Sequence, residues 1–197
     1  IPYMILADQR YDDRMLFENA YDLLSGVWLG SYDAYTLAKG IGYPLFLVLA
    51  KKLCLPYSML LALLQAVGAW LFVRAVSVRW QNPYGQAILY LLLLFSPISL
   101  TLLVTQRLYR MAIVPGMVLV VFSGMIGLTL RKELPLKKQL PWAVLTGVAL
   151  AFFWQIREDS VWILPFVAVM TVWNVGYVIL ALHKKRTGRQ LLLQCFI

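Results

Sequence analysis

The chain of 197 residues is 61% hydrophobic and only 14% charged, and its formal net charge is +9. An average soluble domain is roughly 45–50% apolar, so this composition excludes an ordinary soluble domain and predicts an integral membrane protein. The basic residues stand at the ends of apolar runs, where an anionic lipid surface attracts them, so the positive charge indicates membrane anchoring rather than nucleic-acid binding.

The first 56 residues form an N-terminal region rich in acids. Residues 1–6 read as the end of an apolar span, so we expect the chain to be an N-terminal fragment of a longer polytopic protein. Residues 12–25 have helical spacing with one apolar face, which predicts a helix along the membrane surface. Residues 43–53 are apolar but about half a span long, which predicts a second interfacial or re-entrant helix. Six of the nine acids lie here: Asp8, Asp12, Asp13, Glu18, Asp22 and Asp33.

Five longer apolar segments follow. Each is about as long as a membrane-crossing helix, and each must be helical because unpaired backbone groups cannot face lipid. The predicted spans are residues 57–76, 87–104, 111–130, 140–156 and 161–182. The predicted fold is therefore an all-α transmembrane helix bundle with three parts: residues 1–56, the five-helix region 57–182, and a basic loop with the start of a further span at 183–197.

Basic residues gather in alternate loops. These loops hold Arg74, Arg79, Arg131, Lys132, Lys137, Lys138, Lys184, Lys185, Arg186 and Arg189, with Glu133 as their one acid. The positive-inside rule makes them cytoplasmic. The N-terminal region and the loops at residues 105–110 and 157–160 then face outward, which puts eight of the nine acids on the outer side. We therefore expect the functional site on the outer face.

Asp12 and Asp13 are the first candidates for catalysis. Two adjacent carboxylates can bind a divalent cation, or one can act as general base while the other holds a positive group. The alternative is a solvated helix start, because Asp is favoured at helix N-termini. The two cysteines, Cys54 and Cys195, stand far apart and support neither a disulfide framework nor a Cys-based metal site.

Two stretches of the N-terminal region add a family resemblance. Residues 26–32 read Gly-Val-Trp-Leu-Gly-Ser-Tyr, and residues 39–46 read Lys-Gly-Ile-Gly-Tyr-Pro-Leu-Phe. With an outer-face Asp-Asp pair after the first span, they resemble the first outer loop of the GT-C membrane glycosyltransferases, which include the protein O-mannosyltransferases and the lipid A aminoarabinose transferases. In topology the resemblance covers essentially the whole chain. Pro44 stands alone where many relatives have a Pro-Pro pair, which leaves the subfamily and its sugar open.

The resemblance implies a polyprenyl-phosphate-linked sugar donor and an essential acid at Asp12 or Asp13. A donor phosphate would need cations. Arg107 and Arg110 lie three residues apart, on one face of a helix, and guanidinium binds phosphate bidentately; the alternative is snorkelling to the lipid headgroups. Lys39 is a further candidate, because the Gly-x-Gly after it would let a ligand approach the backbone.

A secondary or acceptor site is predicted from charges in a very short outer loop. Arg157, Glu158 and Asp159 open a block that reads Arg-Glu-Asp-Ser-Val-Trp-Ile-Leu-Pro, which resembles a poorly characterised bacterial branch of the same family. Charges so near hydrocarbon tend to be paired or functional, and an ion pair within the loop is the structural alternative. Trp28 and Tyr32, in the outer loop, are candidates for stacking on a sugar.

These patterns favour a glycosyltransferase of the bacterial cytoplasmic membrane with its active face outward. Its partners would be the lipid-linked donor, membrane lipids and an acceptor glycan, lipid or protein, but no nucleic acid, and a divalent cation is the cofactor considered. The alternative is a non-enzymatic membrane protein, a transporter or a lipid-binding scaffold. Transporters generally place ionisable residues within their spans, whereas Arg74 lies only at the edge of one here.

Overall fold

The computed structural model describes residues 12–28, 39–100, 110–156 and 160–183. Within these ranges the chain forms α-helices and short 3-10 helices and no strand. The elements are α1 (Asp12–Leu24), α2 (Gly42–Lys52), α3 (Tyr57–Val76), α4 (Pro83–Leu94), η1 (Pro97–Leu100), η2 (Arg110–Ile113), α6 (Val114–Leu130), α7 (Leu136–Ile156), η3 (Ser160–Ile163) and α8 (Leu164–His183). The prediction of an all-helical protein is confirmed for these residues.

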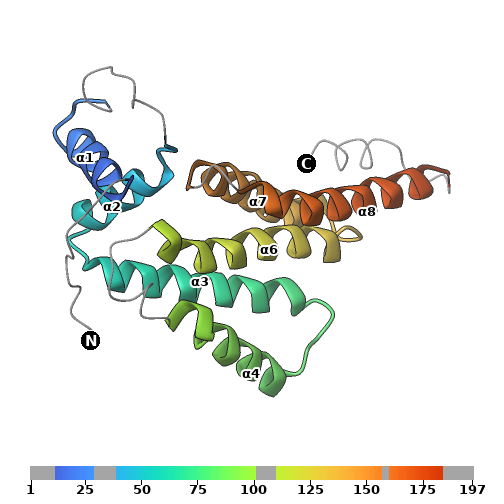
Figure 1. The fold of residues 1–197 in the computed structure, drawn as a ribbon. Helices are drawn as coiled ribbons and strands as arrows, with labels where there is room; N and C mark the ends of the chain where they lie inside the picture. The colour runs from blue at the N-terminus through green and yellow to red at the C-terminus, as the bar shows by residue number, and fades with distance from the viewer. Residues whose placement is uncertain (1–11, 29–38, 101–109, 157–159, 184–197) are drawn as a thin grey trace.

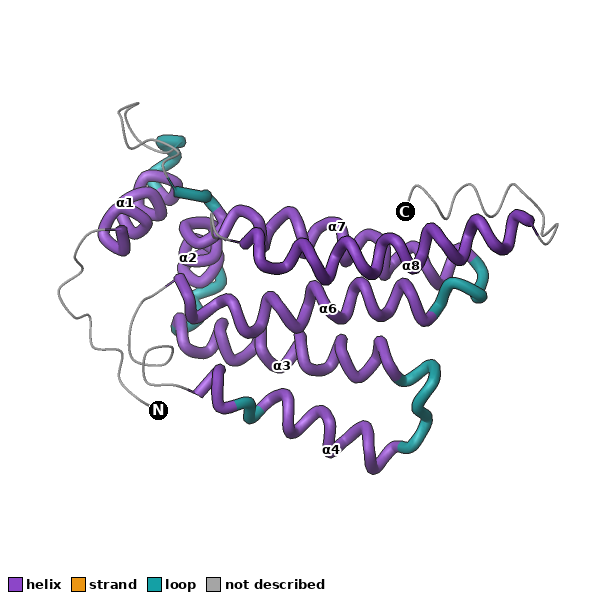
Figure 2. The backbone as a smooth tube through the Cα atoms, turned by 45° about the vertical axis from the view of Figure 1, so that its right-hand side comes forward, coloured by secondary structure: helices purple, strands orange, loops and turns teal. Residues whose placement is uncertain are grey.

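The long helices run side by side and alternate in direction (Figures 1 and 2). Four helical segments of the described chain are long and apolar enough to cross a membrane: Tyr57–Val76, Arg110–Leu130, Leu136–Ile156 and Ser160–Leu180. The protein is therefore a membrane protein. One end of the bundle carries α2, the starts of α3 and η2, and the end of α7; we call it the α2 end. The other, which we call the basic end, carries the loops at residues 77–82 and 131–135 and the end of α8.

Helix α6 lies between α3 and α7, and small residues bring the three backbones close together. A Cβ on Gly68 of α3 would lie 2.9 Å from the carbonyl oxygen of Gly116 of α6. On another side of α6, a Cβ on Gly124 would lie 3.0 Å from the Cα of Thr146 in α7. Because lipid is as apolar as these side chains, close van der Waals packing and not water exclusion holds the three helices together.

The second predicted span differs from the structure. Helix α4 starts at Pro83, where the Asn82 side chain caps it, and it ends at Leu94. Pro97 lacks the N–H that would bond to the Leu93 carbonyl in a continued helix. Instead, Nε2 of Gln65 in α3 donates to the Leu93 oxygen at 2.8 Å. Because residues 101–104 of this predicted span lie outside the described ranges, the count of five spans stays a prediction.

Arg131 ties the basic end together. It follows α6, and only 8% of its surface is exposed. Its Nη1 donates to the carbonyl oxygens of Ala75 at 3.0 Å and Gly127 at 3.2 Å, and its Nη2 donates to Arg74 O at 2.6 Å. Its guanidinium also stacks on the Trp142 ring of α7, 4.2 Å from the centroid. One cation thus donates to carbonyls at the ends of two helices and packs on a third.

Candidate functional site

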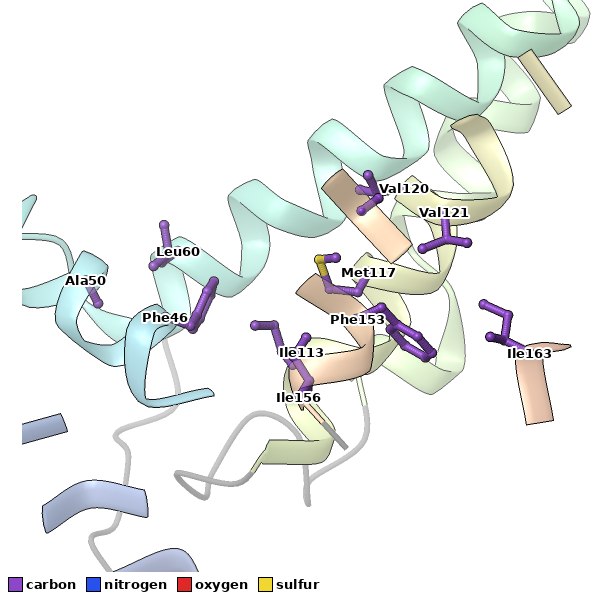
Figure 3. Close-up of a cluster of buried hydrophobic side chains, with 11 residues drawn as sticks. Phe46, Ala50, Leu60, Ile113, Met117, Val120, Val121, Phe153, Ile156 and Ile163 are labelled. Carbon is purple, nitrogen blue, oxygen red and sulfur yellow. The ribbon is translucent and has the colours of Figure 1, made fainter. Parts of the chain in front are cut away.

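The α2 end has a buried core that joins α6 to five other elements. Phe46 of α2, Leu60 of α3, Ile113 of η2, Ile156 of α7 and Ile163 of η3 belong to one cluster of buried side chains (Figure 3). Ile113 and Ile156 lie next to each other in this view, and Phe46 lies beside Leu60. The short helix α2 is therefore fixed to the ends of the long helices.

The Gly-x-Gly segment at the start of α2 lies against the end of α7. A Cβ on Gly42 would lie 2.8 Å from the carbonyl carbon of Gln155, and a Cβ on Gly40 would overlap the Gln155 carbonyl oxygen. The sequence interpretation was that these glycines leave room for a ligand. The structure shows them in contact with the α7 backbone, so the bare glycines are required for helix docking.

That docking places Lys39 at the α2 end. Lys39 is half-buried and immediately precedes Gly40. Arg110, also half-buried, opens η2 three residues before the core residue Ile113. Both predicted phosphate-binding cations therefore belong to segments anchored in the same core. The structure gives no ligand contact for either, so their phosphate-binding role stays a prediction.

The helix predicted over residues 12–25 is present as α1, and part of its apolar face is buried against α2, while its position along the membrane surface stays a prediction. Leu16 and Ala20 are 1% and 4% exposed, and α1 makes its main contacts with α2. Arg14 donates from Nε to Glu18 at 2.8 Å on the exposed side. Asp12 and Asp13 form the first turn of α1. Their side chains lie outside the described part of the structure, so base, cation ligand and helix cap all remain open for this pair.

Several other predicted site residues fall outside the described ranges. Trp28 is an exception. It follows the end of α1 within the described residues and is 69% exposed, so its ring is available for stacking. The residues outside are Tyr32, Arg107, Arg157, Glu158 and Asp159. Among the residues that the structure describes, no group of three or more His, Cys, Asp or Glu side chains could hold a metal ion. The cation considered for Asp12 and Asp13 therefore stays a prediction.

Sequence reasoning missed a pair of tyrosines between α2 and α3. The hydroxyl oxygens of Tyr43 and Tyr57 lie 3.1 Å apart, within hydrogen-bond distance. Tyr43 is 2% exposed, and the Tyr57 ring meets both the Tyr43 and Phe46 rings edge to face. The sequence shows one Tyr at the start of each helix, but it does not show that α2 and α3 pack together and so bring the two hydroxyls into contact.

The α2 end thus brings together a short docked helix, a partly buried hydroxyl pair and two anchored cations. We compared the chain with known proteins. No protein-family model, no curated protein and no solved structure matches the chain.

Proposed function

We propose that the protein is a GT-C-type membrane glycosyltransferase that moves a sugar from a polyprenyl-phosphate carrier to an acceptor on the outer face of the bacterial cytoplasmic membrane. The observation that carries the proposal is the docking of α2 by Gly40 and Gly42 onto Gln155. It gives a fixed position at the α2 end to the Lys-Gly-x-Gly-Tyr-Pro segment on which the family resemblance rests. The phosphate of a lipid-linked donor lies at the boundary between membrane and water. If the α2 end lies at this boundary too, the site and the bond that breaks would be at the same depth in the membrane.

The reaction needs three parts. An acceptor hydroxyl oxygen attacks the anomeric carbon of the sugar while the bond from that carbon to the phosphate oxygen breaks. A carboxylate, Asp12 or Asp13, takes the hydroxyl proton. The lipid phosphate leaves with the bonding electron pair, and Lys39, Arg107 and Arg110 stabilise its negative charge through charge-assisted hydrogen bonds.

Alanine substitution at Asp12 and at Asp13 tests this assignment in the full-length protein. We expect Asp12→Ala, Asp13→Ala or both to abolish glycan transfer, because loss of a general base costs typically 10²–10⁴-fold in rate. The readout is mass spectrometry of cell-envelope glycans from a deletion strain that carries each variant.

Two carboxylates elsewhere on α1 provide matched controls. Glu18 is exposed and paired with Arg14, so Glu18→Gln, like Asp22→Asn, should leave transfer intact and show that the first turn is what matters. Membrane insertion should be normal in all four variants. Normal transfer by both alanine variants would reject the proposal and would favour the alternative of a transporter or a lipid-binding scaffold.

A further inference from the structure

Lys132 holds its ammonium group against α8 at the basic end. This residue follows Arg131 in the loop after α6 and is half-buried. Its Nζ lies 3.9 Å from the centroid of the Tyr177 ring and 5.4 Å from that of Trp173. Tyr177 lies six residues before the end of α8, or about 9 Å at 1.5 Å per residue. The cation is thus directed along the span rather than away from it.

A groove of about 570 Å³ runs along α8 from this ammonium group. Apart from Lys132 its lining is apolar or aromatic: Ala168, Val169, Val172, Trp173, Gly176, Tyr177 and Leu180. Val169 and Val172 are 66% and 71% exposed, so in the described structure the groove faces outward from the bundle. Its volume lies within the range of ordinary ligand pockets, roughly 300–1,000 Å³.

We propose that this groove is a binding site for one anionic phospholipid, with the lipid phosphate at Lys132 and an acyl chain along Val169 and Val172. The charge pattern selects this occupant. A phospholipid carries an anionic group and an apolar chain in the same order as the cation and the groove, and basic pockets beside transmembrane helices bind such headgroups. The site lies at the opposite end of the bundle from the proposed transferase site and does not depend on it.

The neighbourhood of Lys132 agrees with an anionic partner. Burial lowers the pKa of the Lys132 ammonium, and the nearby Arg79 lowers it further, while Glu133 raises it. A lipid phosphate at Nζ would oppose the effect of burial. The aromatic rings of Trp173 and Tyr177 hold the cation in place and suit the headgroup level of a membrane, where such rings concentrate.

Thermal unfolding of the full-length protein in neutral detergent micelles tests the site. Added phosphatidylglycerol should raise Tm by roughly 3 °C or more over phosphatidylcholine with the same acyl chains. Lys132→Gln should abolish this difference. The control is Lys138→Gln, which removes the same charge from an exposed position nearby. This variant should keep the difference in Tm between the two phospholipids. Native mass spectrometry should show one retained phosphatidylglycerol in the wild type and none in Lys132→Gln.

A second variant tests the groove without changing the charge. Val172→Trp should fill the groove and abolish the phosphatidylglycerol effect, whereas Val148→Trp, at the 64% exposed Val148 of α7, should not. Three results would overturn the proposal. They are an equal effect of both phospholipids on the wild type, an equal loss in Lys138→Gln and Lys132→Gln, or an unchanged effect in Val172→Trp. An equal effect of both phospholipids is also the result expected if another helix covers the groove.

Discussion

Gln65 shows how a single polar side chain can be accommodated in an apolar helix. It is 7% exposed, within α3, and it donates to the Leu93 carbonyl that Pro97 leaves without its helical partner. Inside a membrane no water is present to donate a hydrogen bond to an unsatisfied carbonyl. The glutamine therefore supplies the hydrogen bond that the proline cannot, although 32 positions separate Gln65 from Pro97 in the sequence.

This pairing leads to a prediction about stability. Gln65→Leu should destabilise the protein by about 1 kcal/mol, the usual scale of a hydrogen bond between transmembrane helices, because it removes the donor to Leu93. The measurement is Tm in detergent micelles.

A double-mutant cycle identifies the cause. In a Pro97→Ala background the backbone N–H at residue 97 can bond to the Leu93 carbonyl, so the cost of Gln65→Leu should shrink. An equal cost in both backgrounds would show that Gln65 acts through packing instead.

At the scale of elements, α2 is held by close backbone contact. Tyr43 and Phe46 supply its largest buried side chains, but the approach itself depends on Gly40 and Gly42 having no Cβ. A side chain on Gly42 would meet the α7 backbone, which cannot turn aside as a flexible side chain can. Any activity that relies on the position of α2 should therefore be lost with this contact.

Gly42→Ala is expected to shift α2 away from α7 and to lower Tm by several degrees, in line with overpacking costs of roughly 1–3 kcal/mol. The matched control is Gly147→Ala, because a Cβ on Gly147 of α7 meets nothing within 4 Å. Alanine has the higher helix propensity, so this control should be neutral or slightly stabilising. Equal Tm changes in the two variants would show that the contact with Gln155 is unimportant.

The sequence was a good guide to the helices and a weaker one to their ends. Apolar length predicted α3, α6, α7 and α8, and helical spacing predicted α1 as residues 12–25 against the observed Asp12–Leu24. It did not show α4 ending at Leu94, because the run of apolar residues continues past Pro97 while the backbone hydrogen bonds do not. The contact of Arg131 with α3 and Trp142 was also out of reach, since it joins three helices.

For the whole molecule, the alternating helices give the two ends different chemistry. The basic end carries Arg131 and Lys132, and the α2 end carries α1 and the docked α2. The candidate site could be predicted from sequence only as a set of residues on one face. The common core under Lys39 and Arg110 required the fold, because Phe46, Ile113 and Ile156 come from three separate segments.

The predicted orientation can be tested with a natural probe. Cys54, in the turn after α2, is exposed, and we expect a membrane-impermeant maleimide to label it in intact spheroplasts of a Cys195→Ala variant. The control is a triple variant, Gln81→Cys with Cys54→Ala and Cys195→Ala, which carries its thiol at the basic end. It should react only after the membrane is permeabilised. The reverse pattern would contradict the predicted outward α2 end.

The central place of α6 also sets an order for biosynthesis. The ribosome makes α3 and α4 before α6, so Gly68 of α3 must wait for its contact with Gly116, and the Ala75 carbonyl oxygen must wait for Arg131. Arg131 is made only after the final turn of α6, and it then binds Arg74 O and Ala75 O. A nascent chain shorter than this point can pair α3 with α4 through Gln65 and Leu93, but it lacks the Arg131 side chain that joins α3 to α6. We therefore expect the contact between α3 and α6 to form later in synthesis than the contact between α3 and α4.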